Sequence, residues 1–292
     1  VDGVDPKGQP EVVKDEGACL VVDGKNTMGQ IGASFAMQQV IARAKDIGMA
    51  AAGVRGSNHC GAMAYFARMP LEHDMIGIAT TNALPTMAPW GGAERILGIN
   101  PLGFAIPAGK EDPIIFDAAF SGTAHGKIRV YHQKGLTLPE GWAADKDGVP
   151  TTDAAEALDG LLLPVGAFKG VSLALIMGIL SSMLSGASYG TELGNMDDGP
   201  NAGEDGHFVA AIRVSAFEEV DIFKTRVDKA VQQIHNSRKA PGVDRLYAPG
   251  EPEAIRRENY RREGIPLNDI TLADIKNTAE VRGVATDGYA WL

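Results

Sequence analysis

Short apolar runs alternate along this chain with segments of helical periodicity, and this alternation limits the fold more than any other feature. One apolar run, 49–54, leads into a glycine-bounded polar turn, and a helical segment, 62–69, leaves that turn. Upstream, residues 31–47 repeat their apolar side chains at helical spacing and stop at Gly48. Because strands and helices alternate without an internal repeat, the sequence predicts an α/β fold.

The rest of the chain continues this pattern. Further strands are expected at 19–22, 75–80, 103–106, 113–118 and 207–214. Further helices are expected at 122–134, 222–234, 252–263 and 271–281, with turn-rich loops at 139–153 and 190–206. The most apolar run, 171–187, is too short to span a bilayer and is interrupted by serines and a glycine. We therefore expect it to form a helix that is buried on most of its sides.

Charge and cysteine content exclude several classes of protein. The chain carries 27 Lys and Arg against 37 Asp and Glu, a net charge of −10, so it offers no broad basic footprint for a nucleic acid. We expect neither a nucleic-acid nor a membrane partner. Two cysteines, Cys19 and Cys60, give no disulfide framework, which favours a reducing compartment and predicts a cytoplasmic protein.

The turn after the first central strand contains a histidine, His59, flanked by Gly56 and Gly61. A strand, a glycine-bounded turn and a helix hold a polar side chain at a sheet end, beside free backbone N–H groups. Proton chemistry and an anionic ligand could meet at such a place. The alternative is that His59 only closes the turn, and its position alone leaves both interpretations open.

Other polar groups stand in glycine-rich or strand-end positions, where Asn and Asp usually close turns. They are Asn82, Asn100, Asp117, His125, Lys169 and Glu251. Lys169 is more specific, because a cation before an apolar helix is unfavourable unless it meets an anion. The sequence has no Gly-x-Gly-x-x-Gly fingerprint, no Walker phosphate loop and no Gly-x-Ser-x-Gly elbow. His125 and His132 lie about 10 Å apart along one helix, too far for one ion, so we expect no metal site.

Several short motifs occur in order along almost the whole chain. They are Ser57-Asn58-His59 with Gly61, Pro89-Trp90-Gly91-Gly92, Gly98-Ile99-Asn100-Pro101, Asp117-Ala118, His125-Gly126-Lys127-Ile128, Leu138-Pro139-Glu140-Gly141-Trp142, Pro150-Thr151-Thr152-Asp153, Leu163-Pro164-Val165-Gly166 with Lys169-Gly170, and Pro249-Gly250-Glu251. Through them the chain resembles the malate/L-lactate dehydrogenase family of NAD(P)-dependent oxidoreductases. That family includes ureidoglycolate, sulfolactate and diketogulonate enzymes and cyclic-imine reductases.

The resemblance implies a mixed sheet with flanking helices and a non-Rossmann mode of NAD(P) binding, in agreement with the missing glycine fingerprint. It implies one catalytic unit, 1–292, in which about 55–215 binds NAD or NADP and 1–54 with 216–292 forms a second part. It also implies a homodimer whose active site is near the subunit contact. His59 is then the acid–base residue, and Ile99, His125 and Gly126 lie near the substrate. The dinucleotide-binding residues are His59, Cys60, Gly61, Ala62, Met63, Phe116, Asp117, Ala118, Lys169, Gly250 and Glu251.

Two departures from the family pattern qualify this expectation. The common Gly-Thr-Asn-Pro occurs here as 98–101 with Ile99 in place of the threonine, so a hydroxyl contact is lost. A Ser-His pair and an Arg of the family's N-terminal segment have no match, and we expect that segment to be missing.

The expected activity is hydride transfer between NAD(P)H and a small 2-oxo acid or 2-hydroxy acid. Alternatives are reduction of a cyclic imino acid, or dinucleotide binding without turnover.

Overall fold

The computed structural model describes residues 3–194, 203–286 and 288. Contacts between Cα atoms divide the chain into two compact units, one ending at Pro249 and one beginning at Gly250, and we describe each by itself. The expected division into a cofactor-binding part, about 55–215, and a second part stays a prediction. Among the described residues, no helix has both the length and the apolar character needed to cross a membrane.

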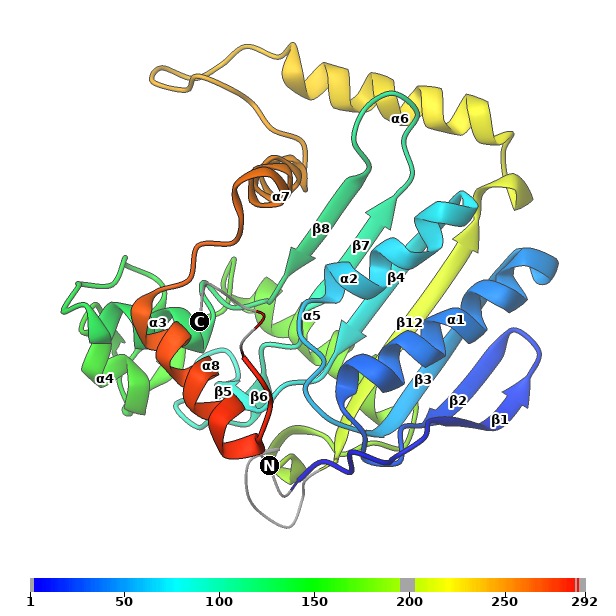
Figure 1. The fold of residues 1–292 in the computed structure, drawn as a ribbon. Helices are drawn as coiled ribbons and strands as arrows, with labels where there is room; N and C mark the ends of the chain where they lie inside the picture. Colours follow the sequence, from blue (N-terminus) through cyan, green and yellow to red (C-terminus); the bar gives the residue numbers. More distant parts are fainter. Residues whose placement is uncertain (1–2, 195–202, 287, 289–292) are drawn as a thin grey trace. The chain divides into compact units, whose positions relative to one another are not determined.

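A seven-stranded sheet forms the centre of the first unit (Figure 1). Its strands, in spatial order, are β1 (Glu11–Glu16), β2 (Cys19–Asp23), β3 (Met49–Ser57), β12 (Asp205–Arg213), β4 (Met75–Thr81), β7 (Leu102–Ile106) and β8 (Ile114–Ala118). The β2–β3 pair is parallel, and the other neighbours in this sheet are antiparallel. The α/β class and the mixed sheet are therefore confirmed. Strand β12 enters between β3 and β4, although it follows them by more than a hundred residues.

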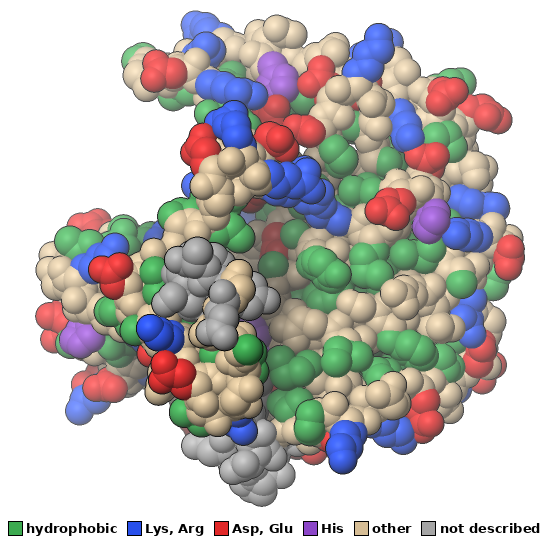
Figure 2. Space-filling view, in the orientation of Figure 1, with side chains coloured by type: hydrophobic (Ala, Val, Ile, Leu, Met, Phe, Trp, Pro, Cys, Tyr) green, Lys and Arg blue, Asp and Glu red, His purple; other side chains and the backbone are tan. Residues whose placement is uncertain are grey.

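Two helices cover one face of this sheet (Figure 1): α1 (Gly29–Ile47) and α2 (Met63–Arg68), which continues into the 3-10 turn η1 (Met69–His73). The apolar residues of α1 repeat every three or four positions, so one stripe of the helix is buried against the strands. Gly48 ends α1 with φ 102, a conformation that favours glycine, as the sequence predicted. Hydrophobic side chains also reach the surface over these helices (Figure 2), among them Ile31 and Tyr65.

Helix α5 (Phe168–Gly178) and the following π-helical turn η2 (Ile179–Met183) correct one expectation. The apolar run was expected to be buried on most sides, yet its large side chains are exposed: Leu173, Leu175, Ile176, Ile179, Met183 and Leu184. The reason is that the segment turns its small residues inward, namely Gly170, Ala174, Gly178, Ser181 and Ser182. A Cβ on Gly206 of β12 would lie 2.2 Å from Ser181 O, so η2 and the sheet approach more closely than larger residues would permit.

A second apolar cluster lies beside the sheet and is built from short elements. They are β5 (Pro85–Met87), β6 (Leu97–Gly98), α3 (His125–Gln133), β9 (Ala143–Ala144), α4 (Ala154–Asp159) and β11 (Leu161–Leu162), and α5 contributes Ala174. Strand β10 (Pro150–Thr151) pairs with β9, and the 3-10 turn η3 (Gly190–Glu192) follows η2 in the chain. The expected loop 139–153 thus contains two short strands. Of the expected loop 190–206, residues 195–202 lie outside the described part of the chain.

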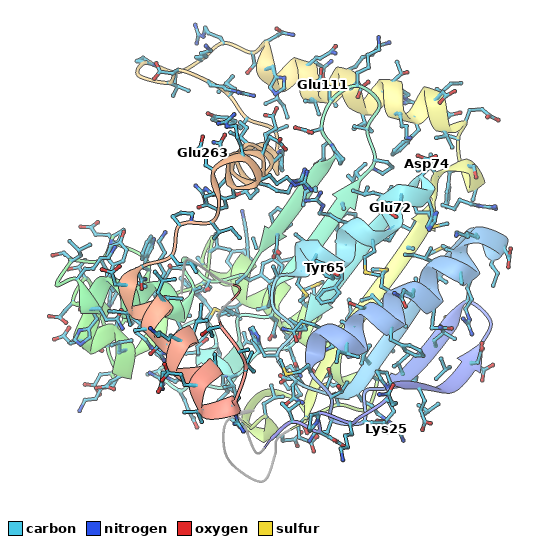
Figure 3. All side chains as sticks on the ribbon, in the orientation of Figure 1. Lys25, Tyr65, Glu72, Asp74, Glu111 and Glu263 are labelled. Atoms are coloured by element: carbon cyan, nitrogen blue, oxygen red, sulfur yellow. The ribbon has the colours of Figure 1, made fainter. Side chains whose placement is uncertain are left out.

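Helix α6 (Val220–His235) follows β12 and the 3-10 turn η4 (Val214–Ala216). The Asp228 carboxylate on α6 accepts backbone N–H groups of Gly109, Lys110 and Glu111, at 2.9, 2.9 and 3.2 Å, and these bonds lower its pKa. Lys224 of the same helix forms an ion pair with Asp74, which Figure 3 labels. The second unit contains α7 (Glu251–Glu263) and α8 (Asp269–Arg282), close to the bounds that the sequence predicted.

Candidate active site around His59

The predicted turn lies between the end of β3 and the start of α2. His59 is exposed there, whereas the residues on either side of it, Asn58 and Cys60, are buried. Gly61 has φ 82, so the chain reverses at a position where a side chain would be strained. The layout of a strand, a polar turn and a helix is therefore confirmed, and it presents one imidazole to solvent at a sheet end.

One side of the turn is fixed by Asn58. Its Nδ2 donates to Asn26 Oδ1 at 2.9 Å and to Thr27 O at 3.0 Å, in the loop that enters α1. Asn58 Oδ1 is buried and has no hydrogen-bond partner among the described residues. The start of α1 lies directly against the turn, because a Cβ on Gly29 would lie 1.9 Å from Asn58 O. Only glycine fits at that contact.

The other side of the turn is fixed by His207 of β12, which sequence reasoning included in a strand without assigning it a role. Its Nε2 lies 2.7 Å from Ser57 Oγ, and its Nδ1 lies 2.8 Å from Thr81 Oγ1 and 3.6 Å from Cys60 Sγ. Burial, together with the nearby charge of His59, lowers the pKa of His207 to about 4. The only signal in the sequence was a histidine within an apolar strand, where an uncharged, hydrogen-bonded ring is required.

Two further ionisable groups stand near this side of the turn. Burial raises the pKa of the Cys60 thiol to about 12, so at neutral pH it is a protonated, inert thiol. Asp205 of β12 pairs with Ser57 across the sheet, and burial raises the pKa of its carboxyl group to about 7. Of these two groups, only the Asp205 carboxyl group changes its charge near neutral pH.

Asp117, at the end of β8, brings a second predicted segment to the turn. Its Oδ2 accepts the backbone N–H of Ala64 at 2.7 Å, in the first turn of α2, which has no capping side chain of its own. Partial burial raises the pKa of this carboxyl group, and the N–H groups of Ala64 and Met63 lower it. Phe116 is exposed on the same strand and Ala118 is half-buried.

The side chains of the predicted dinucleotide segment divide into two sets. Those of Cys60 and Met63 point into the core, so these residues could offer a ligand only backbone atoms. Gly61 and Ala62 are exposed beside His59, and Tyr65 is exposed on the outer side of α2, where Figure 3 labels it. The exposed part of the turn thus consists of His59, Gly61 and Ala62.

The predicted substrate residues belong to the second apolar cluster. Ile99 is half-buried against it, His125 begins α3 half-buried, and Gly126 is exposed. Backbone hydrogen bonds join this region to the loop before α5: Phe120 N donates to Ile99 O at 3.0 Å, and Val165 N donates to Phe120 O at 2.9 Å. Residue 99, the entry to α3 and the Lys169 loop are consequently held together.

Lys169 is exposed in the first turn of α5, and it forms no ion pair with any residue that the structure describes. The residue before α5, Ala167, has φ 58 and ψ −128, a sparsely populated backbone conformation. Gly250 and Glu251, at the start of α7, belong to the second unit, and their place in a dinucleotide site stays a prediction.

A cavity of about 410 Å³ lies apart from these residues. Residues of three motifs that carry the resemblance line it, namely 89–92, Pro150 and 163–164, together with Asp147, Gly148 and neighbouring apolar side chains. None of the predicted site residues lines it. The cavity and the exposed turn that carries His59 are therefore separate places on the first unit.

Comparison with known proteins decides the family. Residues 2–276 match the model of the family described as malate/L-lactate dehydrogenase. This chain belongs to the malate/L-lactate dehydrogenase family. Among its relatives, the L-sulfolactate dehydrogenase of Methanocaldococcus jannaschii is 36% identical over 98% of this chain and 82% of its own length. The malate dehydrogenase of Entamoeba histolytica has a solved structure with a TM-score of 0.93, at 31% identity, over 97% of this chain and 82% of that one.

Two other members of the malate/L-lactate dehydrogenase family bear on the chemistry. A ureidoglycolate dehydrogenase of Escherichia coli K12, named with NAD(+), is 32% identical over 89% of this chain and 75% of its own length. The Δ1-piperideine-2-carboxylate reductase of Pseudomonas syringae has a TM-score of 0.83 at 28% identity, over 94% of this chain and 82% of that one. The proteins that this chain is similar to thus include enzymes named for hydroxy acids and one named for a cyclic imine.

Proposed function

We propose that this protein is a dehydrogenase that transfers a hydride from NAD(P)H to a small 2-oxo acid and, in the reverse direction, from the 2-hydroxy acid to the oxidised dinucleotide. Family membership supports the reaction class, and the observation that carries the proposal is the position of His59. An exposed imidazole stands at a sheet end on a turn that buried hydrogen bonds fix from both sides. An imidazole can accept one proton and return it in the course of such a reaction.

The residues around the turn suit a nicotinamide dinucleotide. Gly61 and Ala62 leave the backbone beside His59 open, and the exposed Phe116 offers an apolar surface on β8. Lys169 stands at the start of α5, where a cation and free backbone N–H groups attract a phosphate. The dinucleotide would bind in a non-Rossmann mode, because the central sheet is mostly antiparallel and the sequence lacks the glycine fingerprint.

When bound, the dinucleotide supplies or accepts the hydride; the protein manages the proton. In oxidation, C2 of the hydroxy acid loses a hydride while an unprotonated ring nitrogen of His59 takes the hydroxyl proton, leaving a C=O bond. In reduction, the His59 imidazolium returns that proton to the carbonyl oxygen. We further propose that Ile99, His125 and Gly126 orient the substrate, for which the packing of residue 99 with the entry to α3 gives support.

Two properties of the whole protein belong to the same proposal. We infer a homodimer, because six large apolar side chains of α5 and η2 are exposed together on the described chain. We also infer action in the cytoplasm, because Cys19 and Cys60 are both free thiols. Whether NAD or NADP is preferred is decided by assay.

The first test replaces His59 by Asn. We expect turnover of the best 2-oxo acid to fall about 10²- to 10⁴-fold, and dinucleotide affinity to fall much less, because asparagine removes the proton transfer but keeps a polar side chain beside the dinucleotide. The control is His73→Asn, which changes an exposed histidine of η1. A His59→Asn protein with undiminished turnover would remove His59 from the mechanism.

A panel of 2-oxo acids and cyclic imino acids, each with NADH and NADPH, selects the substrate class. The cyclic imine reductase among the structural relatives favours the second class as the alternative. Faster oxidation of the cofactor with a cyclic imine would assign C=N reduction instead. Dinucleotide binding seen by fluorescence, with no turnover on either class, would identify a binding module.

A further inference from the structure

A chain of hydrogen bonds runs beneath the His59 turn and crosses three neighbouring strands. His207 on β12 contacts Ser57 on β3 through Nε2 and Thr81 on β4 through Nδ1. All three side chains are buried, with exposed fractions of 1% for His207, 0% for Ser57 and 7% for Thr81. Buried polar side chains that bond to one another are held in one arrangement, because an unpaired donor or acceptor in the core is unfavourable.

The contacts of Thr81 fix the direction of the chain. Its hydroxyl oxygen lies 3.0 Å from Asn82 O and 3.1 Å from Gly206 O, and both carbonyl oxygens only accept hydrogen bonds. If the Thr81 hydroxyl proton points to one of these carbonyls, Thr81 accepts a hydrogen bond from Nδ1–H of His207. Nε2 is then unprotonated and accepts the hydroxyl proton of Ser57. We assign this tautomer, in which the hydrogen-bonded network ends at carbonyl oxygens and holds geometry without conducting a proton.

The ring of His207 contacts the polypeptide on both sides of His59. Ser57, two residues before His59, bonds to Nε2, and the Cys60 sulfur, one residue after it, lies 3.6 Å from Nδ1. One rigid ring thereby sets where the turn leaves the sheet and where it rejoins the core. The ionisable groups around it are His59, Cys60, Asp117 and Asp205, and a charge on His207 would oppose that of His59.

We propose that His207 is a positioning residue for His59. From β12 its uncharged ring joins Ser57 to Thr81 and holds the imidazole of His59 in the orientation that proton transfer requires. The inference rests on the proposed role of His59 and extends it to a residue that does not touch the substrate.

The test compares variants that each remove one hydrogen bond of the series Ser57–His207–Thr81. Ser57→Ala removes the donor to Nε2. His207→Asn keeps an N–H near Thr81 but does not reach Ser57, while His207→Gln places an acceptor near Ser57. The matched control is Thr80→Val, since Thr80 has 1% of its surface exposed and its hydroxyl donates to Pro101 O at 2.8 Å, away from His207.

We expect Ser57→Ala and His207→Asn to lower kcat by about ten- to a hundredfold, because a small displacement of an acid–base group is costly. KM for the dinucleotide should stay within about threefold. The double variant should be no slower than either single variant, since both act through one contact. His207→Gln should recover most of kcat, and Thr80→Val should lower the melting temperature with kcat changed less than about twofold. Ser57→Ala and His207→Asn proteins that match Thr80→Val in both measurements would overturn the proposal.

A second measurement does not depend on turnover. In protein with ¹³C- and ¹⁵N-labelled histidine, the His59 ring signal, assigned by its loss in His59→Asn, should shift in Ser57→Ala and stay in place in Thr80→Val. The ¹⁵N shifts of His207 in the wild type should show a proton on Nδ1 and none on Nε2 at neutral pH. The opposite tautomer, or an unmoved His59 signal, would refute the inference even if the variants fold poorly. Absence of wild-type turnover on every substrate would refute the proposed function instead, and the ring signals would still decide the role of His207.

Discussion

The sheet end that carries His59 and the outer face of α5 differ in whether their side chains find contacts within the same chain. At the sheet end, buried polar side chains bond to one another within the chain, from Asn58 with the 26–27 loop to His207 with Ser57 and Thr81. On α5 and η2 the small residues face inward, toward the sheet and the second apolar cluster, and the large apolar side chains face outward. The first region is complete in a single chain. The second exposes apolar surface, which the second copy of the proposed homodimer would cover.

The largest expected loss of stability comes from adding one methyl group at the sheet end that carries His59. Gly29→Ala would place a Cβ 1.9 Å from Asn58 O and 2.8 Å from Cys60 Cβ, so either α1 or the His59 turn must move. We expect the free energy of unfolding to fall by about 3 kcal/mol or more, because backbone atoms cannot yield as a flexible side chain does. Denaturant unfolding monitored by circular dichroism measures this loss.

The control for that prediction lies one turn further along the same helix. A Cβ on Gly32 would meet Ser57 Oγ at 3.4 Å, an ordinary contact. Gly32→Ala should therefore be neutral or should stabilise the protein by up to about 1 kcal/mol through helix propensity. If Gly29→Ala is as stable as Gly32→Ala, the sheet end is not closely packed, and the contrast with α5 fails.

The second prediction concerns two buried groups of β12 whose titrations oppose each other. In the folded protein, burial and the His59 charge lower the pKa of His207 to about 4, and burial raises that of Asp205 to about 7. Between pH 4 and 6.5 the unfolded chain thus binds a proton on His207 that the folded chain lacks. Over the same range, the folded chain keeps a proton on Asp205 that the unfolded chain has lost. The two contributions to the pH dependence of stability cancel.

Replacing either residue should leave the contribution of the other to the pH dependence of stability. Asp205→Asn leaves His207, so its free energy of unfolding should fall relative to the wild type as pH decreases from 6.5 to 4. His207→Gln leaves Asp205, so its free energy of unfolding should rise over that range. Each slope approaches about 1.4 kcal/mol per pH unit at most. Urea unfolding of both variants at several pH values measures the difference between them, and a difference that does not change with pH contradicts the prediction.

The same contrast explains what could be predicted from the sequence. Apolar periodicity predicted α1, β3, β4 and the entry to α2, because local spacing reports which face is buried. It did not report that β12 pairs between β3 and β4, since that register joins residues far apart in sequence. The contact of His207 with Ser57 depends on this pairing and so had no local signal. For α5, composition showed an apolar segment but not that its small residues face the sheet.

The candidate site was predicted in two different ways. The layout of strand, turn and helix pointed to His59 from local residues alone, and the structure places it exposed as that layout requires. Local residues indicated only that Lys169 should meet an anion. The dinucleotide-binding role of Lys169 and the substrate role of His125 came only from the family resemblance, because their neighbours in space come from separate loops. The bond from Asp117 to the start of α2 joins residues 53 apart, and neither segment alone indicates it.

The smallest expected change in the stability of a single chain comes from the α5 face. Ile176→Lys adds a charge to a side chain that is 49% exposed, so the unfolding free energy of the monomer should change by no more than about 0.5 kcal/mol. Light scattering after size exclusion should nevertheless show a dimer for the wild type and a monomer for the variant, because a buried, unpaired cation is excluded from an apolar interface. The control is Ile47→Lys, at the end of α1, with a side chain that is 55% exposed. Equal masses for Ile176→Lys and the wild type would mean that α5 is not the subunit contact, and both regions would then be complete in one chain.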